Sequence, residues 1–427
     1  MEYLLFAGYL FLFAWLVTRV KFFTRSGLSK SQLIIILLLK VLAGIFYGWI
    51  GIYYSGHARM WDTWNFHTNG LYEYHLLLNN PHDYFTNLFQ TSYADGFSRF
   101  FESSDSYWND LKGSFFIKLL SVFNIFSQGH YYVNVIFYSF FTLFGAMAIF
   151  RVMNDAFPGK RLTILLATFL IPSFLYWTSG IHKEGLIFTG IALCVYSIYF
   201  GNKEKRFSAR KITALAAGLL LVLTLRNFLV VLLLPALLTW LLANRYPQKG
   251  KWIFGIAYLF FVFLFFTAKH LSSRLDFPQA VADKQQEFVK LKGKTTVPIR
   301  ELEPTATGFL KNTPQAISLS MFRPYPGDVH HFLSLAASVE INLLLGLFLL
   351  FLWRRADGSR SGPLLYFCIY FSVSVLLAIG YSNNNIGAIV RYRSIIIPLL
   401  VIPMIAQTDW SFISRLIRNS IKKYNNI

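Results

Sequence analysis

The chain has 427 residues, of which 55% are hydrophobic and only 14% are charged, and its mean hydropathy is +0.47. Soluble domains carry about 25% charged residues, so this composition excludes an ordinary soluble enzyme, and the 18% of aromatic residues exclude a disordered chain. The net charge is +20, and the two cysteines, which both lie in apolar runs, predict neither a disulfide framework nor a cysteine metal site.

The apolar runs predict an all-α polytopic membrane protein, because many of them approach the roughly 20 residues that span a bilayer core. The first run is interpreted as a retained span rather than a signal peptide, since no basic region precedes it and no small-residue cleavage site follows it. We expect about eleven transmembrane helices in one membrane domain, residues 1–427, near 3–18, 32–54, 131–150, 162–178, 185–200, 212–225, 228–244, 252–268, 334–353, 363–380 and 394–408.

Basic residues are concentrated in the short loops on one side of this topology. Those loops and the C-terminal tail, residues 409–427, hold 22 basic residues and four acidic ones. The positive-inside rule places them in the cytoplasm, with the N-terminus outside and the C-terminus inside. We therefore attribute the high positive charge to orientation in a lipid bilayer with anionic headgroups, and we expect no nucleic-acid partner.

The two longest connections, about 55–130 and 270–333, lie on the non-cytoplasmic side of the predicted topology. All nine histidines and sixteen of the 20 acidic residues fall on that side. Long loops in compact proteins are commonly functional, and these are expected to carry short interfacial helices. Side chains able to move protons are therefore concentrated outside the cytoplasm.

Asp62 stands just after the second predicted span, between Trp61 and Trp64. A carboxylate at the membrane interface beside aromatic rings can accept a proton from a hydroxyl group, and the two indole rings could stack on a sugar. The competing interpretation is that Asp62 caps the next helix and the tryptophans anchor that helix in the interface.

Polar residues also interrupt the apolar runs at two outer turns. His182, Lys183 and Glu184 occupy a short turn, where Lys183 could bind phosphate and Glu184 could orient it or act as an acid. Arg226 lies at the next outer turn and suits bidentate phosphate binding. The plain alternatives are a turn that neutralises its own charges and an arginine that reaches back to the interface.

Three more arginines lie on the outer side, against the charge bias of the rest of the chain. Arg323 is followed by two nearby prolines that fix the backbone direction at the end of the second long loop. Asn385, Arg391 and Arg393 precede the last span on a predicted outer turn, where anion binding would explain the two cations. Interaction of these side chains with the membrane edge is the alternative.

These residues together suggest one outer site for an anionic headgroup. The catalytic candidates are Asp62 and Glu184. No organic cofactor is expected, and a divalent cation would suit a phosphate beside Asp62, but the sequence offers no metal ligand set such as His-x-x-x-His. The candidates for binding phosphate or sugar are Lys183, Arg226, Arg323, Arg391, Arg393, Trp61, Trp64, His182 and Asn385.

At these residues the chain resembles bacterial GT-C-type membrane glycosyltransferases and O-antigen or exopolysaccharide polymerases. The similar features are the span layout and four short patches: Asp62 in an aromatic first outer loop, Trp-x-Ser-Gly-x-x-Lys-Glu at 177–184, Arg-Pro-aromatic-Pro at 323–326, and Asn-x-Gly-x-x-x-Arg-x-Arg at 385–393 before a span with a proline. The resemblance implies transfer of a sugar or glycan repeat unit from a polyprenyl-phosphate or -diphosphate carrier to a glycan or lipid acceptor. It also implies a bacterial inner-membrane location, a non-cytoplasmic site and a general-base role for Asp62.

Two other classes of function fit the same composition. A transporter or flippase for a lipid-linked saccharide would need polar groups deep in the membrane, and Lys40, Glu340 and Arg226 are the few such residues. A non-catalytic scaffold for envelope-polysaccharide assembly could use the basic tail for docking. A scaffold has no need, however, for a carboxylate and several arginines around one cavity.

Overall fold

The structure is a computed structural model, and it describes residues 1–54, 62–98, 100, 106–291, 293, 295–356 and 362–411. Within these ranges every named element is a helix, and the β-type pairing consists of two isolated antiparallel bridges, Thr296 with Asn385 and Arg355 with Thr408. The predicted all-α class is therefore confirmed. Most of the predicted basic tail, residues 412–427, lies outside the described residues.

Seven helices are long and apolar enough to cross a membrane, which indicates an integral membrane protein. Two further pairs of helices pass the same test together, although each pair is bent: α8 (Arg161–Phe169) with α9 (Pro172–Ser179) by 54°, and α18 (Ile386–Ser394) with α19 (Ile397–Ala406) by 59°. The seven are α3 (Lys30–Tyr53), α7 (Tyr131–Ala156), α10 (Lys183–Lys203), α12 (Asn227–Arg245), α13 (Gly250–Thr267, with flanking turns), α16 (Phe332–Trp353) and α17 (Pro363–Ser382).

The expected number of eleven spans is not confirmed, because two of the eleven segments form shorter helices. These are α1 (Glu2–Val17), with 16 residues, and α11 (Ala209–Leu225), with 17 residues. At 1.5 Å per residue they measure about 24 and 26 Å, less than the hydrocarbon thickness of about 30 Å. The described residues thus contain seven to nine candidate spans.

The bent pairs change the expected placement of Arg391 and Arg393. We predicted a turn before the last span, but both arginines lie on α18, the first half of a bent pair. Prolines explain why each pair is broken. Pro172 and Pro398 lie in the first turns of α9 and α19, where the missing backbone N–H of proline breaks no helical hydrogen bond. A proline cannot continue the preceding helix, because it has no N–H to donate and its ring clashes with the preceding turn.

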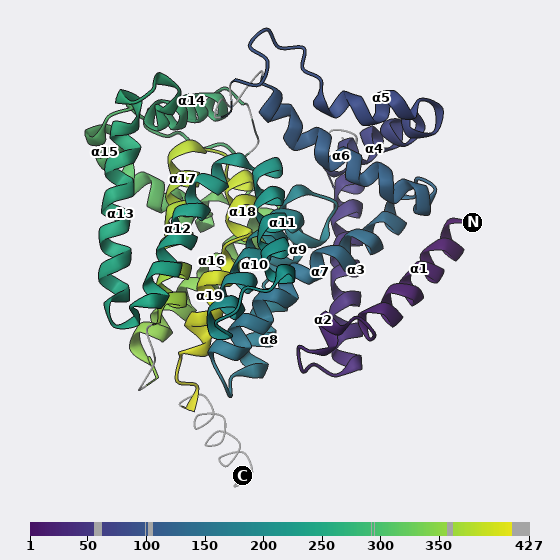
Figure 1. Ribbon diagram of the computed structural model, residues 1–427, viewed down its shortest axis with the longest axis horizontal. Coiled ribbons are helices and arrows are strands. Elements are labelled where there is room, and N and C mark those ends of the chain that lie inside the picture. Colours follow the sequence, from purple (N-terminus) through teal and green to yellow (C-terminus); the bar gives the residue numbers. More distant parts are fainter. Residues whose placement is uncertain are drawn as a thin grey trace.

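The two long connections form a layer at one end of the helical bundle. Figure 1 shows α4 (Asp62–Asn79), α5 (Pro81–Thr86) and α6 (Tyr107–Ser127) at the upper right and α14 (Phe277–Lys290) and α15 (Ala306–Ile317) at the upper left, whereas α2 (Lys21–Thr24) and α8 lie lower. Side-chain caps begin several of these helices, as Ser106 does for α6 and Asp276 for α14. Both long connections therefore contain helices.

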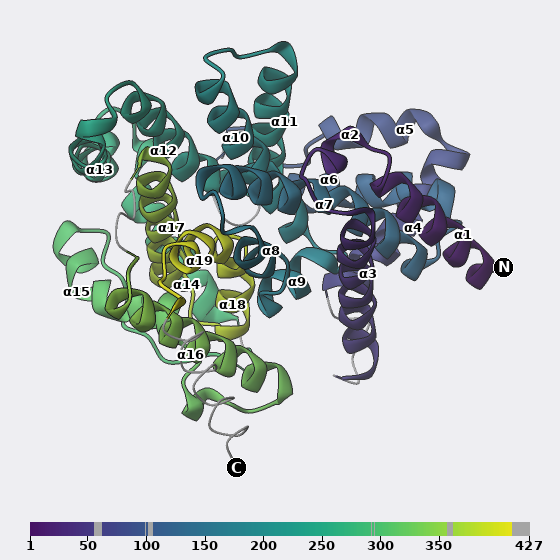
Figure 2. The same ribbon diagram turned by 90° about the horizontal axis from the view of Figure 1, so that it is seen from below.

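The bundle has a buried centre and two lipid-facing helices. The most apolar windows of α7 and α10 are 89% and 78% buried, whereas those of α13 and α16 are each 11% buried. Seen from below, α1, α3 and α4 gather on one side and α12, α13 and α15 on the other, with α8, α9 and α10 between them (Figure 2). The broken pair α8–α9 thus lies centrally.

Two deep charges fix the short helix α9 at both ends. Glu340 of α16 accepts hydrogen bonds from the Ser173 backbone N–H, at 2.6 Å, and from the Ser173 hydroxyl, at 2.5 Å, at the start of α9. Lys40 of α3 donates to the Thr178 carbonyl and to the Ser179 hydroxyl, both at 3.1 Å, at its end. An anion at the N-terminus and a cation at the C-terminus both complement the helix dipole, so the turn that follows α9 is held in place.

Candidate functional site

Five side chains from four separate parts of the chain meet at one place in the structure. They are Asp62 at the start of α4, His182 and Glu184 at the α9–α10 turn, Arg226 between α11 and α12, and Arg391 on α18, and we call them the polar cluster. Sequence reasoning selected all five, and the structure brings them together. Asp62 and Arg391, 329 positions apart, are directly bonded, with 2.5 Å between Nη1 and Oδ2.

His182 connects the two carboxylates of the polar cluster. Its Nδ1 is hydrogen-bonded to Glu184, and its Nε2 lies 3.2 Å from Asp62 Oδ2. The hydroxyl of Tyr138 donates to the His182 carbonyl oxygen, which fixes the backbone of the turn. Because His182 is only 1% exposed and Glu184 is fully buried, the imidazole has a fixed orientation.

The arginines neutralise the two carboxylates. Arg226 Nη2 donates to Glu184 Oε1 at 2.7 Å, and Arg391 Nε lies 3.6 Å from the same oxygen. The ring of Tyr392 packs against both guanidinium groups, at 4.2 Å from Arg226 and 5.0 Å from Arg391. Buried carboxylates need such partners, because an unpaired charge in a low-dielectric interior is costly.

Asp62 is the member of the polar cluster that reaches solvent, since its side chain is 51% exposed. Burial raises the pKa of Asp62, but the hydrogen bond from His182 and the positive charge of Arg391 outweigh it and hold that pKa well below its usual range. Asp62 is therefore ionised at physiological pH. It presents an exposed hydrogen-bond acceptor next to a buried imidazole.

Two lysines beside the polar cluster have no carboxylate partner within the described part of the chain. Lys183 lies over the Phe66 ring, 5.1 Å from its centroid. The pKa of Lys112, on α6, is lowered to about 8, mainly by burial and also by the positive charges of Lys284, Lys183 and Arg226, while the negative charge of Glu287 opposes this shift. With two carboxylates against two arginines and two lysines, the region carries an excess of positive charge and is suited to an anion.

Glycines allow α3 to approach the α9–α10 turn closely. A Cβ atom on Gly180 would lie 2.2 Å from Tyr47 Cδ1, and one on Gly44 would lie 2.6 Å from the Ser179 carbonyl oxygen. Only a residue without a side chain fits at either position. The turn that carries His182 is therefore packed against α3 as well as held by α9.

The other predicted site residues lie outside the polar cluster and have structural partners. Arg393 donates to the backbone carbonyls of Ser320 and Arg323, and Arg323 pairs with Asp328 at 3.2 Å. Asn385 caps α18 by accepting from the Ala388 N–H at 3.2 Å.

The structure describes one of the two predicted tryptophans, Trp64. The Trp64 indole donates to the Gly48 carbonyl at 3.0 Å and stacks on Tyr131 at 4.1 Å, so it packs against α3 and α7. Trp61 lies outside the described residues.

Sequence reasoning did not select Lys112, Tyr138 or Tyr392. Tyr392 stands between two selected arginines, but its role depends on the helical conformation of α18. Lys112 is a lone cation in the N-terminal third of α6, and nothing in its neighbourhood distinguishes it from a solvated lysine. In the described part of the chain, no group of three or more His, Cys, Asp or Glu side chains has a metal-binding arrangement.

Comparisons of the chain with protein-family models, with curated proteins and with solved structures found no match.

Proposed function

We propose that the protein transfers a sugar or a glycan unit from a polyprenyl-phosphate or -diphosphate carrier to a glycan or lipid acceptor at the outer layer of the membrane domain. The observation that carries this proposal is the polar cluster, which combines an exposed ionised carboxylate, a buried carboxylate–imidazole pair and an excess of cations in one place. The likeness to GT-C-type enzymes and polysaccharide polymerases at four patches supports the same conclusion.

The cations would bind the carrier phosphate and stabilise it as it leaves. In the described part of the chain neither Lys183 nor Lys112 forms an ion pair with a carboxylate, so both would bind the incoming headgroup. Arg226 and Arg391 stand on the other side of the cluster. As the bond between the anomeric carbon and the phosphate oxygen breaks, negative charge grows on that oxygen, and preorganised donors are most effective where charge develops.

Asp62 would remove the proton of the acceptor hydroxyl. The acceptor hydroxyl donates a hydrogen bond to Asp62, its oxygen attacks the anomeric carbon, and its proton passes to the Asp62 carboxylate. His182 Nε2, 3.2 Å from Asp62 Oδ2, would orient that carboxylate. Glu184, bonded to Nδ1, would hold the imidazole ring in place.

The proposed location is the bacterial inner membrane, with the polar cluster on the non-cytoplasmic face, the N-terminus outside and the basic tail in the cytoplasm. The concentration of basic residues in the short loops supports this orientation. Mass spectrometry of lipid-linked glycans in cells that lack the gene tests the function. A glycan that lacks one sugar would indicate a transferase, and accumulated single repeat units a polymerase; an unchanged glycan profile would contradict the proposal.

Lys112 should make binding of the donor depend on pH. Its amine is charged below its pKa of about 8 and loses this charge as the pH rises. Because a charge-assisted hydrogen bond contributes about 1.5–3 kcal/mol, we expect the KM for the donor to rise about tenfold between pH 7 and pH 9. Kinetics of the purified protein would show this, and Lys112→Arg should keep the low KM at pH 9.

A matched control is Lys269→Gln, which removes an exposed lysine distant in sequence from Lys112 and should leave the pH dependence of the KM unchanged. If Lys112→Gln retains the full rise in KM, another group titrates, and Lys112 does not contact the anion.

A transporter of lipid-linked saccharides is the second candidate, because two bent helix pairs meet near the polar cluster, and broken helices often form substrate sites in transporters. The buried charges of Lys40 and Glu340 are explained without a transport role, because these side chains bind the two ends of α9.

We expect Lys40→Met to destabilise the protein by about 1–3 kcal/mol, because it leaves polar groups of α9 unpaired. Thermal unfolding in detergent measures this. Normal stability with lost substrate binding would instead favour a transport role.

A further inference from the structure

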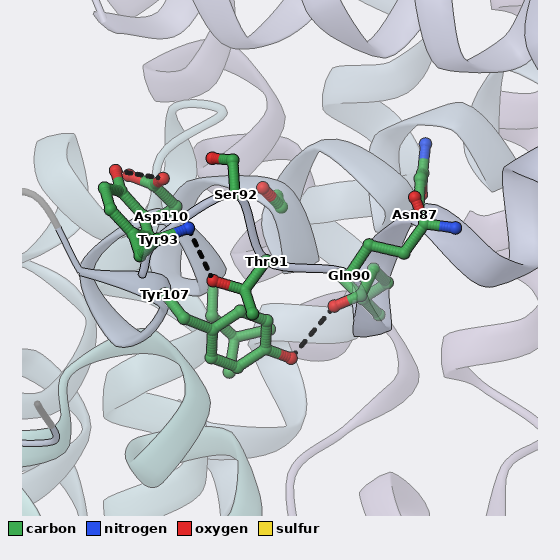
Figure 3. Close-up of a pocket in the computed structure, with 10 residues that line it drawn as sticks. Asn87, Gln90, Thr91, Ser92, Tyr93, Tyr107 and Asp110 are labelled. Atoms are coloured by element: carbon green, nitrogen blue, oxygen red, sulfur yellow. Dashed lines mark hydrogen bonds between the residues drawn. The ribbon is translucent and has the colours of Figure 1, made fainter. Parts of the chain in front are cut away.

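A second, smaller site lies in the outer layer. A pocket of about 140 Å³ is enclosed by η2 (Asn87–Phe89), the following segment 90–93, and the first turns of α6 (Figure 3). On α6 the pocket is lined by Tyr107, Asp110, Leu111 and Ser114, which share one helix face. Lys112 points about 150° away from the centre of that face. The pocket is thus separate from the cations beside the polar cluster.

Hydrogen bonds hold the walls of this pocket in place. The Tyr93 hydroxyl donates to Asp110 Oδ2 at 2.8 Å, and the Tyr93 backbone N–H donates to Thr91 Oγ1 at 3.2 Å. The Tyr107 hydroxyl donates to the Leu88 carbonyl at 2.9 Å, which fixes the Tyr107 ring against the pocket (Figure 3). The shape of the pocket is therefore set by the protein itself.

Several polar groups of the pocket remain available to a ligand. In the described part of the chain, the side chains of Gln90, Ser92 and Ser114 have no hydrogen-bond partner. Asn87 donates its amide N–H to Glu73 at 3.2 Å and keeps its carbonyl oxygen, and Asp110 keeps its second carboxylate oxygen. The pocket thus offers hydroxyl and amide donors together with several acceptors.

The chemistry of the lining selects one class of ligand. Among the described residues that line the pocket there is no lysine, arginine or histidine and there is one carboxylate, so this lining would repel phosphate and other anions. One carboxylate without further anionic ligands is also a poor cation site. Alternating donors and acceptors around a tyrosine ring match the hydroxyl groups and the apolar face of a pyranose. The volume of about 140 Å³ is too small for a sugar chain.

We propose that this pocket binds one neutral sugar unit, a hexose or an N-acetylhexosamine, and that Asp110 excludes uronic acids. This inference goes beyond the proposed transfer reaction and does not depend on the polar cluster. A sugar held at this pocket would anchor a glycan at the outer surface.

Saturation-transfer NMR on the full chain in lipid nanodiscs tests this inference, with glucose, galactose, N-acetylglucosamine and glucuronate as probes at about 10 mM, since single-sugar sites bind in the millimolar range. We expect a signal for at least one neutral sugar and none for glucuronate. Ser114→Phe, which fills the pocket, should remove the signal. Asn87→Ala combined with Gln90→Ala should weaken it at least fivefold.

The double variant tests the pocket even if Ser114→Phe misfolds, because it removes polar side-chain groups without adding volume. Gln286→Ala, on the exposed side of α14, is the matched control and should bind as the natural chain does. Asp110→Asn should admit glucuronate. Absence of any signal in the natural chain, or an equal signal in both pocket variants, would overturn the inference. Neither result would bear on the proposed transfer reaction at the polar cluster, because that reaction is tested by separate activity measurements.

Discussion

Replacement of Asp62 by asparagine is expected to reduce glycan transfer by about 10²–10⁴-fold, the usual loss when a positioned proton acceptor is removed. An amide has nearly the same shape as the carboxylate, but it cannot take the proton of the acceptor hydroxyl. Because Asp62 is half exposed and starts a helix, the variant should fold normally. Transfer from a synthetic polyprenyl-linked donor by the purified protein in nanodiscs measures the effect.

The KM for the donor should change little in Asp62→Asn, because the phosphate is bound by the cations. Asp283→Asn is the matched control: it removes an exposed acidic residue of the same layer, on α14, and should retain full activity. If Asp62→Asn transfers sugar at the natural rate while the donor and acceptor are saturating, Asp62 does not take part in the chemistry.

Arg226→Met is expected to lower the free energy of unfolding by about 3 kcal/mol, the low end of the cost of breaking a buried ion pair. Glu184 is fully buried, and this variant removes its 2.7 Å partner while Arg391 at 3.6 Å and His182 remain. Thermal unfolding in detergent gives the change. The same variant should reduce transfer strongly, since Arg226 would also stabilise the leaving phosphate.

The double variant Glu184→Gln with Arg226→Met separates stability from function. Because both charges are removed, most of the lost stability should return. Transfer should stay low, because His182 loses its carboxylate partner and the phosphate loses a cation. A single variant that is as stable as the natural chain would show that Glu184 does not depend on Arg226, and a double variant with normal transfer would remove both residues from the proposed mechanism.

All five members of the polar cluster were among the predicted site residues, whereas Arg323, Arg393 and Asn385 were predicted with them and lie elsewhere. Asp62 follows an apolar run, and Glu184 and Arg226 interrupt such runs, on one side of the predicted topology, where charged side chains are costly without partners. Their pairing was not predictable, since it depends on which helices are neighbours. The spacing of Arg391 and Arg393 shows this limit: on a helix, positions i and i+2 point about 200° apart, so only one could face Asp62.

The helical class and most spans were predictable from hydropathy, whereas the breaks within spans were not. The run near 162–178 is continuous in hydropathy, but Pro172 divides it into α8 and α9 and so places a helix end inside the protein. Glu340 then binds the backbone N–H of Ser173 at the start of α9, and Lys40 binds the Thr178 carbonyl at its other end. From sequence alone, these charges were equally compatible with a transport pathway.

The most direct measurement is a cryo-electron microscopy structure of the protein in nanodiscs with a non-hydrolysable polyprenyl-diphosphate sugar. Our account predicts phosphate density within hydrogen-bonding distance of Lys183 and Arg226, with the anomeric carbon facing Asp62. Phosphate bound elsewhere on the membrane domain, or Asp62 and Arg391 separated on different faces with no cleft between them, would contradict it.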